Sequence, residues 1–328
     1  MTSSFAYARA TSVDDAVTRL ARAGARACAG GTDLLGCLRD EVFEASVVVS
    51  LKGLDRLRGI GEATGSGAAS PATLRIGALA TIAQIAHHPD VRARYTALAE
   101  AAALVASPQL RNQGTLGGNL CQRPRCWFYR GGYPCARKGG ETCFAMQGDN
   151  RYHCIFGGST CLIVHPSDTA PALVALDAQV RIAGPRGERT VPAGDFFVLP
   201  ERDMTKENVL ETGEIVTEVL LPSPPTRSAY RKARGRGSWD FALAGGAVAL
   251  TMRDGIVRTA RVVLSGVAPI PWRAAGAERA LEGRRLDARA IARAAEAAVA
   301  GAQPLEHNGY KVLLARGVVE EALSSLSG

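Results

Sequence analysis

The chain has 328 residues, of which 47% are hydrophobic and 5% aromatic, and its formal net charge is +8. This length exceeds one ordinary core and predicts two or three domains. No uninterrupted apolar stretch reaches the roughly 18 residues that a membrane-spanning helix needs, and the first residues lack the apolar core of a signal peptide. We therefore expect no membrane span and no export signal within this chain.

The positive charge alone does not indicate a nucleic-acid partner. Basic residues are scattered among acidic ones, and the one dense basic stretch, residues 227–236, has Tyr230 as its only aromatic residue. A basic stretch without stacking aromatics or a reader motif is more typical of a solvated face or of a contact for an anionic cofactor. We expect no nucleic-acid binding.

The first eighty residues predict short helices and strands in alternation. Ser12 is placed to cap a helix whose first turn holds Asp14 and Asp15, and Gly24 is placed to end it. Strands are predicted at residues 26–29, 47–50 and 74–78, with a glycine-rich loop at 61–71 before the last of them.

Two glycine pairs are candidate binding turns. Gly30-Gly31 directly follows the strand predicted at 26–29, and Gly117-Gly118 lies in the loop at 107–119. Glycine permits positive φ and has no Cβ, so its backbone N–H groups can approach a phosphate closely. Either pair alone is typical of an ordinary tight turn, whereas both together favour a phosphorylated cofactor.

The middle of the chain mixes helix and strand. Residues 81–87 predict a helix that Pro89 stops, and residues 91–106 predict a longer one. Residues 170–176 predict a further helix, and residues 179–182 and 188–191 predict a hairpin. This part is expected to have an α+β fold.

The closely spaced prolines of residues 222–225 predict a domain boundary. Beyond it, residues 244–252 and 256–267 predict strands joined by the turn Asp254-Gly255, and residues 287–300 and 311–326 predict amphipathic helices. We expect a separate C-terminal α+β domain at residues 226–328.

The segment 121–161 holds most of the cysteines of the chain. Their irregular gaps and the lack of paired Cys-x-x-Cys knuckles make zinc possible but not favoured, and a disulfide framework suits shorter secreted chains. Thiolates on a flexible loop, with arginines to offset charge and aromatic rings to exclude water, favour a [4Fe–4S] cluster. The six cysteines are Cys121, Cys126, Cys135, Cys143, Cys154 and Cys161.

Four motifs in order carry a family resemblance over nearly the whole chain. They are residues 29–35 (Ala-Gly-Gly-Thr-Asp-Leu-Leu), residues 115–119 (Thr-Leu-Gly-Gly-Asn), residues 166–168 (Pro-Ser-Asp), and a closing domain with Lys232. The chain resembles the FAD-binding medium subunits of the xanthine dehydrogenase and aldehyde oxidoreductase family. Its cysteine-rich insertion is similar to the variant with an extra [4Fe–4S] cluster, found in a bacterial periplasmic aldehyde oxidoreductase and in 4-hydroxybenzoyl-CoA reductase.

The resemblance implies an α+β fold with two domains. Residues 1–222 would form an FAD-binding domain of the PCMH or CO dehydrogenase flavoprotein type, in two lobes at about 1–57 and 58–222, with the cysteine-rich insertion at about 121–161. Residues 226–328 would form a CO dehydrogenase flavoprotein-like C-terminal domain.

The resemblance also implies which residues hold FAD. The two glycine turns would grip the diphosphate through backbone amides. Asp168 would accept hydrogen bonds from the ribose or adenine part, with a helix N-cap as the ordinary alternative. Lys232 would place a positive charge near the isoalloxazine ring, with a surface lysine as the alternative. The candidate FAD-binding residues are Ala27, Cys28, Ala29, Gly30, Gly31, Thr32, Asp33, Leu34, Leu35, Ser107, Gln109, Thr115, Leu116, Gly117, Gly118, Asn119, Asp168 and Lys232.

Family comparison implies cluster ligands at Cys126, Cys135 and Cys143, with the fourth at Cys161. Cys154 also lies in a context that could reach the cluster, and Cys121 is interpreted as a packing or reserve thiol. His165, between Cys161 and Asp168, could donate a hydrogen bond to the cluster or to the flavin.

The resemblance implies an electron-transfer subunit of a heterotrimeric molybdenum hydroxylase of the aldehyde oxidoreductase type. A large subunit would carry the molybdenum cofactor, a small subunit [2Fe–2S] clusters, and this chain would pass electrons to an external acceptor. A stand-alone FAD oxidoreductase and a zinc-stabilised assembly module are the alternatives. The expected compartment is the cytoplasm, or the periplasm after export with a signal-bearing partner.

Overall fold

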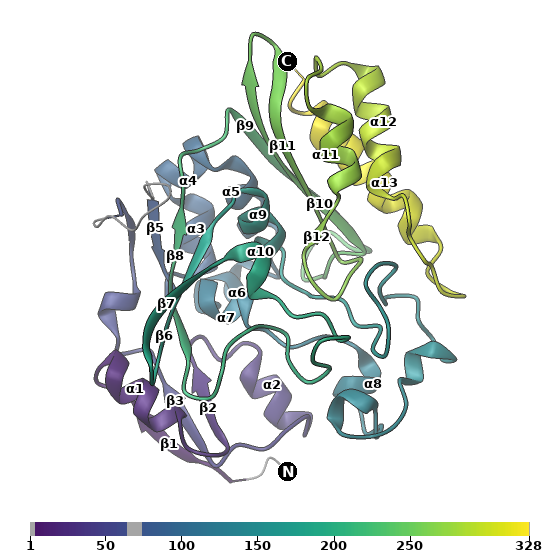
Figure 1. The fold of residues 1–328 in the computed structure, drawn as a ribbon. Helices are drawn as coiled ribbons and strands as arrows, with labels where there is room; N and C mark the ends of the chain where they lie inside the picture. Colours follow the sequence, from purple (N-terminus) through teal and green to yellow (C-terminus); the bar gives the residue numbers. More distant parts are fainter. Residues whose placement is uncertain (1–3, 64–73, 328) are drawn as a thin grey trace.

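The structure, a computed structural model, describes residues 4–63 and 74–327 (Figure 1). Three sheets divide it into an N-terminal lobe, a second lobe and a C-terminal domain. The predicted α+β fold is confirmed. Most of the loop predicted at 61–71 lies outside the described residues.

Three parallel strands in the order β1-β3-β2 form the sheet of the N-terminal lobe. Ser12 caps α1 as predicted, because its Oγ accepts a hydrogen bond from the backbone N–H of Asp15 at 3.0 Å. Val17 and Leu20 of α1 share a small core with Val49 of the sheet. The elements are β1 (Ala6–Arg9), α1 (Val13–Leu20), β2 (Ala25–Cys28), α2 (Leu34–Arg39), β3 (Val47–Ser50) and the 3-10 helix η1 (Asp55–Leu57).

Five antiparallel strands in the order β4-β5-β8-β6-β7 form the sheet of the second lobe. Leu74 pairs with Leu221, so the two ends of this lobe lie side by side. Helices α3, α5, α7 and α9 supply much of its core. The elements are β4 (Ile60–Gly61), β5 (Leu74–Gly77), α3 (Ile82–His87), α4 (Pro89–Arg94), α5 (Thr96–Ala103), α6 (Pro108–Gln113), α7 (Leu116–Leu120), α9 (Thr169–Ala175), β6 (Gln179–Gly184), β7 (Gly187–Pro192), α10 (Ala193–Phe196) and β8 (Ile215–Leu221).

The single helix predicted at 91–106 is wrong. Two helices, α4 and α5, occupy this stretch, and Tyr95 interrupts them with φ −131° and ψ 53°. Tyr95 is buried, and its hydroxyl donates a hydrogen bond to the carbonyl of Pro222 at 2.6 Å. Pro89 starts α4 besides ending α3, since the first helical position needs no backbone N–H.

The C-terminal domain is a four-stranded antiparallel sheet, in the order β12-β11-β10-β9, between two layers of helices (Figure 1). Helices α11, α12 and α13 cover one face. The other face packs on the second lobe, where Tyr230, Ala247 and Val263 belong to that lobe's core. The elements are β9 (Arg227–Ala233), β10 (Ala244–Arg253), β11 (Ile256–Ser265), β12 (Trp272–Arg273), α11 (Ala275–Leu281), α12 (Ala288–Ala298) and α13 (Tyr310–Ser324).

The cysteine-rich segment runs between α7 and α9 and holds only short helices. They are α8 (Trp127–Arg130) and the 3-10 helices η2 (Ala136–Lys138) and η3 (Phe144–Met146). In Figure 1 the segment lies beside the N-terminal lobe and extends up to the C-terminal helices. Hydrogen bonds from the side chain of Asn308 to the carbonyls of His153 and Cys154 attach it to the C-terminal domain.

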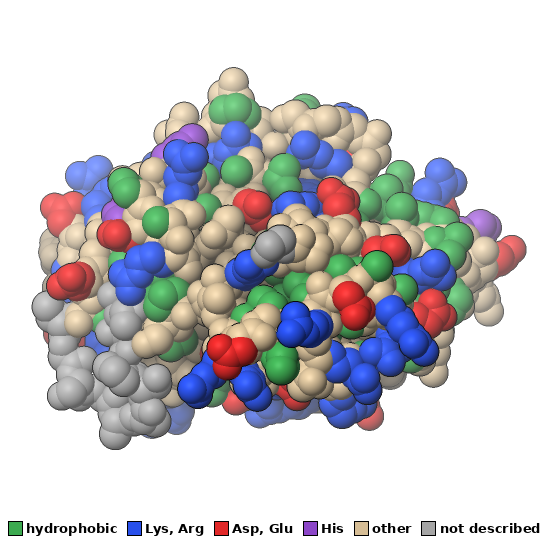
Figure 2. Space-filling view, turned by 90° about the horizontal axis from the view of Figure 1, so that it is seen from above, with side chains coloured by type: hydrophobic (Ala, Val, Ile, Leu, Met, Phe, Trp, Pro, Cys, Tyr) green, Lys and Arg blue, Asp and Glu red, His purple; other side chains and the backbone are tan. Residues whose placement is uncertain are grey.

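No helix in the described ranges is long and apolar enough to cross a membrane. On the face seen from above, Lys and Arg side chains are spread out with Asp and Glu among them (Figure 2). Part of the basic stretch at 227–236 is internal, because Lys232 has a fully buried side chain.

Candidate functional site

Three cavities join end to end between the lobes and the C-terminal domain. The turn cavity, of about 190 Å³, contains the Gly30-Gly31 turn. The middle cavity, of about 210 Å³, shares Thr32 and Gly118 with it. The large cavity, of about 560 Å³, shares Arg125 and Asp168 with the middle cavity. We call the three together the central groove.

The Gly30-Gly31 turn exposes a run of backbone donors to the groove. The backbone N–H groups of residues 30–34 donate no hydrogen bond to any part of the chain that the structure describes. Gly31 has φ +76°, which favours glycine, and a Cβ on Gly30 would lie 2.1 Å from the carbonyl oxygen of Gln113. The turn can therefore bind an anion while lying against the second glycine loop.

The second loop supplies one glycine that faces open space. A Cβ on Gly117 would meet Ala78 at 3.0 Å, so this glycine allows close contact with the residue that follows β5. A Cβ on Gly118 would meet only the Oγ1 of Thr115, at 3.1 Å, and Gly118 lines both the turn and the middle cavities. An added side chain at Gly118 would therefore enter the groove itself.

Asn119 fixes the end of this loop against α9. Its Oδ1 accepts hydrogen bonds from the hydroxyls of Ser167 at 2.5 Å and Thr169 at 2.7 Å. Ser167 in turn accepts a hydrogen bond from the backbone N–H of Ala170 at 3.0 Å. This network holds the polypeptide beside Asp168.

Asp168 presents a buried carboxylate where the middle and large cavities meet. Its oxygens accept hydrogen bonds from the Nζ of Lys232 at 2.7 Å and from the hydroxyl of Tyr230 at 2.8 Å. Burial raises the pKa of Asp168, while Lys232 and Tyr230 oppose that shift. Asp168 occupies the N-cap position of α9, as the alternative expected, but its side chain makes no cap hydrogen bond.

Lys232 does not line the groove itself and contacts it through Asp168 and the backbone of Asp240. Its ammonium also donates hydrogen bonds to the carbonyls of Leu104 at 3.2 Å and Asp240 at 2.9 Å. All three donors are thus used, and its side chain is 0% exposed, so the surface-lysine alternative is wrong.

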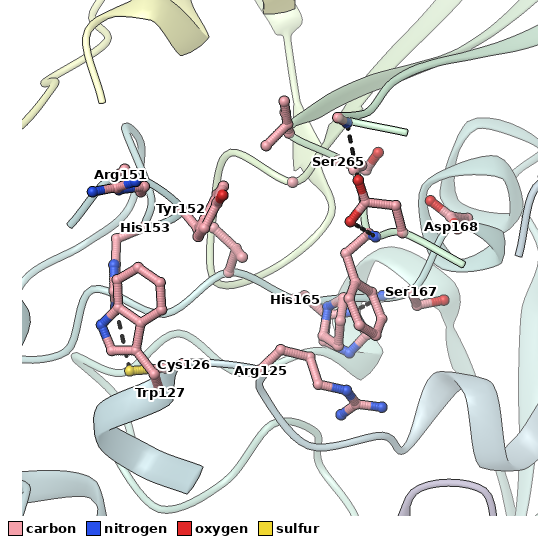
Figure 3. Close-up of a pocket in the computed structure, with 18 of the residues that line it drawn as sticks. Arg125, Cys126, Trp127, Arg151, Tyr152, His153, His165, Ser167, Asp168 and Ser265 are labelled. Carbon is pink, nitrogen blue, oxygen red and sulfur yellow. Dashed lines mark hydrogen bonds between the residues drawn. The ribbon is translucent and has the colours of Figure 1, made fainter. Parts of the chain in front are cut away.

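The large cavity lies between the cysteine-rich segment and the loops around Asp168. In Figure 3, Cys126, Trp127 and His153 lie on one side of it and His165 and Asp168 on the other. Burial lowers the pKa of His165 to about 3 and that of His153 to about 4, so both imidazoles are neutral at pH 7.

A fourth, narrow cavity is lined by the four predicted cluster ligands, Cys126, Cys135, Cys143 and Cys161. It shares Cys126 and His153 with the large cavity, and the Nε2 of His153 lies 3.3 Å from the Sγ of Cys126. Neither Cys121 nor Cys154 lines it. We call it the cysteine cavity.

The thiols of this cavity differ in acidity. Burial raises the pKa of Cys126 to about 11. A hydrogen bond from the thiol of Cys161 lowers the pKa of Cys143, so Cys143 is the readier thiolate. Among the described residues, no group of three or more His, Cys, Asp or Glu side chains is arranged to hold a metal ion.

A buried charge network anchors the cysteine cavity to the second lobe. Arg137 and Arg123 both pair with Glu207, whose side chain is 3% exposed. The Nε of Arg137 donates to Glu207 at 3.1 Å. The rings of Phe128 and Phe144 stack at 6.1 Å beside the thiols and limit the access of water.

Most of the predicted FAD-binding residues line the central groove. Those that do are Ala27, Ala29, Gly30, Gly31, Thr32, Asp33, Leu34, Thr115, Gly118, Asn119 and Asp168. Those that do not are Cys28, Leu35, Ser107, Gln109, Leu116, Gly117 and Lys232. Among the latter, Leu116 is buried in the core, Ser107 caps α6 and Gln109 is exposed.

The sequence alone did not identify several groove residues. Trp239, Asp240 and Phe241 line the middle cavity from the loop after β9, and no motif marks them. Arg125 was expected only to offset thiolate charge, yet it lines the middle and large cavities. Its position next to Cys126 was the available signal.

Comparisons with known proteins agree with this architecture. The family described as "FAD binding domain in molybdopterin dehydrogenase" matches residues 3–224, and "CO dehydrogenase flavoprotein C-terminal domain" matches residues 228–326. The chain is 37% identical over 328 residues to the aldehyde oxidoreductase FAD-binding subunit PaoB of Escherichia coli (strain K12), across 98% of this chain and 97% of that one.

Carbon monoxide dehydrogenase provides the second comparison. The medium chain from Hydrogenophaga pseudoflava is 30% identical over 330 residues, across 98% of this chain and 96% of that one. A solved structure of carbon monoxide dehydrogenase from that organism matches with a TM-score of 0.76, at 30% identity, across 99% of this chain and 97% of that chain. The chain therefore belongs to the family of FAD-binding medium subunits of the carbon monoxide dehydrogenase and xanthine dehydrogenase type, and it is a subunit of an oxidoreductase.

Proposed function

We propose that the chain is an FAD- and [4Fe–4S]-containing electron-transfer subunit of a molybdenum hydroxylase, of the aldehyde oxidoreductase type. The observation that carries this proposal is that the cavities lie side by side and share lining residues. Both glycine loops open onto the central groove, and the groove shares Cys126 with the cysteine cavity. When bound, the two groups supply electron transfer between the molybdenum side of the complex and an external acceptor.

The residues of the groove fit the parts of FAD. The unpaired backbone N–H groups of residues 30–34 would hold the diphosphate, with Gly118 leaving room for it. Asp168 would accept hydrogen bonds from the polar groups of the dinucleotide, and Lys232 would keep that carboxylate ionised and oriented. The large cavity is lined by the two neutral histidines and by the rings of Trp127, Tyr152 and Phe241, which suit an aromatic part of the cofactor.

The cysteine cavity fits a cluster by its donors. Four thiols and no carboxylate line it, which is the soft ligand set that iron–sulfur clusters use. The neighbouring Arg137 would offset the negative charge of the thiolates. A single ion needs its donors within about 2.3 Å of one point, whereas a cluster spreads four thiolates over four irons.

Partners follow from the same proposal. The molybdenum cofactor would lie in a large subunit and [2Fe–2S] clusters in a small subunit, as in the multisubunit enzymes of this family. This chain would then make and break no bond of the organic substrate.

Cofactor analysis of the complex, purified anaerobically, tests the proposal. We expect FAD, molybdenum, and iron and sulfide beyond what the small subunit accounts for. Cys135→Ala should remove about four irons per complex, while Cys154→Ala, a matched change of a buried cysteine outside the cavity, should keep them. Full iron content in Cys135→Ala, or zinc in place of iron, would reject the cluster.

A second assay separates the stand-alone alternative. The isolated chain with bound flavin should not be bleached by an aldehyde in the absence of its partners. Bleaching would show that this chain oxidises substrate itself.

A further inference from the structure

The cysteine-rich segment forms part of the wall of the central groove. Arg123 lines the turn cavity, Arg125 lines the middle and large cavities, and Cys126 lines the large and cysteine cavities. Three residues within four positions of sequence thus extend from the first glycine turn to the thiols.

Asp33, in the first glycine turn, depends on this segment for its partners. Its carboxylate pairs with Arg125 at 2.7 Å and with Arg130 at 2.7 Å, and it accepts the backbone N–H of Arg123 at 2.7 Å. It makes no cap hydrogen bond to α2, whose N-cap position it occupies. The position of the turn is therefore set by residues on either side of Cys126.

Positive charge is in excess at this junction. Four arginines of the segment face two carboxylates, since Asp33 pairs with two of them and Glu207 with the other two. The other carboxylates nearby are engaged: Asp168 pairs with Lys232, and Asp240 accepts the backbone N–H groups of Gly235 and Phe241. Each of these carboxylates is shared by two arginines, so two positive charges are not balanced within the network, and bound anions would stabilise this arrangement.

Arg125 is the arginine that faces the groove most directly. Its side chain is 28% exposed, donates to the Oε1 of Gln122 at 3.2 Å, and stacks over the ring of Phe241 at 5.0 Å. Asp33 and Phe241 hold the guanidinium between them where the middle and large cavities meet. Figure 3 shows it below the large cavity, between Cys126 and His165.

Resting on the proposed function, we propose that Arg125 is a flavin-binding residue supplied by the cysteine-rich segment, and that through it cluster ligation and flavin binding strengthen each other. Arg125 directly precedes Cys126, so ligation of Cys126 fixes the backbone that carries the guanidinium. Without the cluster, this segment becomes ordered only when the flavin binds, and the lost conformational entropy weakens flavin binding. Such a coupling is reciprocal, so a bound flavin also favours the ligated segment.

A double-mutant cycle in the assembled complex tests this coupling. FAD is removed, and its Kd is measured by quenching of flavin fluorescence in the native protein, Cys135→Ala, Arg125→Gln and the combined variant. Cys135 is the site of choice because it lines the cysteine cavity but no part of the groove. We expect Cys135→Ala to raise the Kd for FAD about tenfold. Arg125→Gln should also raise this Kd while the iron is retained. The Kd of the combined variant should exceed that of Arg125→Gln by less than about twofold.

Two controls remove effects of general damage. Cys154→Ala changes a buried cysteine outside the cavity, and Arg39→Gln removes an arginine of α2 whose side chain is 76% exposed. Both should bind FAD with native affinity. Arg125→Lys, which keeps the charge, should restore part of the affinity lost in Arg125→Gln, and Arg125→Gln should bind with a weaker dependence on salt.

The outcomes separate this inference from the proposed function. A native complex without FAD or without the extra iron would reject the function itself. The coupling alone would be rejected if iron-free Cys135→Ala bound FAD with native affinity. It would also be rejected if Cys135→Ala raised the Kd for FAD by the same factor in the native protein and in Arg125→Gln. If Cys135→Ala fails to assemble, native complex stripped of the cluster by a chelator and then reconstituted with iron and sulfide gives the same comparison.

Discussion

The Asp168–Lys232 pair is buried at the point where two cavities of the groove meet. Its side chains are 4% and 0% exposed, and every polar atom involved has a partner. Removing one member leaves the other as an uncompensated charge away from water. The pair is thus more important for keeping the carboxylate in position than for net stability.

We expect Lys232→Met to lower the free energy of unfolding by about 3–5 kcal/mol. Urea unfolding of the flavin-free chain measures this, with Lys206→Met as the control. Lys206 pairs with Glu211 at 3.1 Å on the surface, and its loss should cost at most about 1 kcal/mol. Equal effects of the two substitutions would contradict the buried-pair argument, and adding Asp168→Asn to Lys232→Met should recover part of the loss.

His165 gives a pH-dependent prediction. Burial lowers its pKa to about 3 in the folded chain, whereas an unfolded histidine titrates near 6.5. Between these values the unfolded chain binds the extra proton, so stability is present above pH 6.5 and is lost as the pH falls, at about 1.4 kcal/mol per unit. His165→Gln should flatten this loss by about 2 kcal/mol between pH 6.5 and 5. Urea unfolding at several pH values measures this difference. The prediction is refuted if the free energies of unfolding of both proteins change with pH in parallel.

At the scale of elements, α7 holds two adjacent glycines with different surroundings. Gly117 lies against Ala78, whereas Gly118 has open space beside it in the groove. The sequence motif holds both glycines and does not distinguish them. The difference comes from the packing of Gly117 against Ala78, just after β5, which only the folded chain provides.

We expect Gly118→Val to abolish FAD retention with little change in stability. Gly117→Val should instead destabilise the fold, because its Cβ would meet Ala78 at 3.0 Å. Gly317→Val, in the exposed part of α13 with nothing within 4 Å, is the control and should keep native flavin content. The flavin absorbance and thermal unfolding of the three variants decide between these roles, and a normal flavin spectrum in Gly118→Val would refute the placement.

Local chemistry predicted many elements correctly. Ser12 caps α1, and Asp254 and Gly255 form the turn between β10 and β11 with φ of 55° and 74°. The break at Tyr95 could not be predicted, because apolar periodicity continues through it. Tyr95 departs from helical backbone angles, and its hydroxyl donates a hydrogen bond to the carbonyl of Pro222, 127 residues further along the chain.

The same limit applies to the site. The glycine turns and the cysteines carry local signals in the sequence, and the structure places them along the groove and the cysteine cavity. Lys232 was expected beside the ring, but two of its three partners lie 64 and 128 residues away, and the nearer of these two, Asp168, separates it from the groove. The loop with Trp239 lines the groove only because β9 places it there.

At the scale of the whole molecule, the C-terminal domain and the second lobe share one core. Tyr230, Ala247 and Val263 of the C-terminal sheet belong to the same cluster as Leu98 and Leu173 of α5 and α9. The two matched family regions thus meet near the prolines of residues 222–225, although the parts of the chain on either side share one hydrophobic core. Such domains are expected to unfold together.

We expect residues 226–328 expressed alone to lack a cooperative thermal transition, because the sheet face that carries Tyr230 and Ala247 would be exposed to water. In the full chain, amides of α5 and β9 should show similar protection from hydrogen exchange. Calorimetry of the fragment and hydrogen exchange of the full chain make the comparison. A fragment that melts cooperatively would show that the interface is dispensable.

Glu207 and Asp33 anchor the cysteine-rich segment, yet both lie outside it in sequence. A relative with the motif of residues 29–35 already holds the carboxylate of Asp33, but grafting residues 121–161 into it would transfer Arg123 and Arg137 without Glu207. A successful transplant must carry Glu207 as well, so the insertion and this distant acceptor are expected to be inherited together.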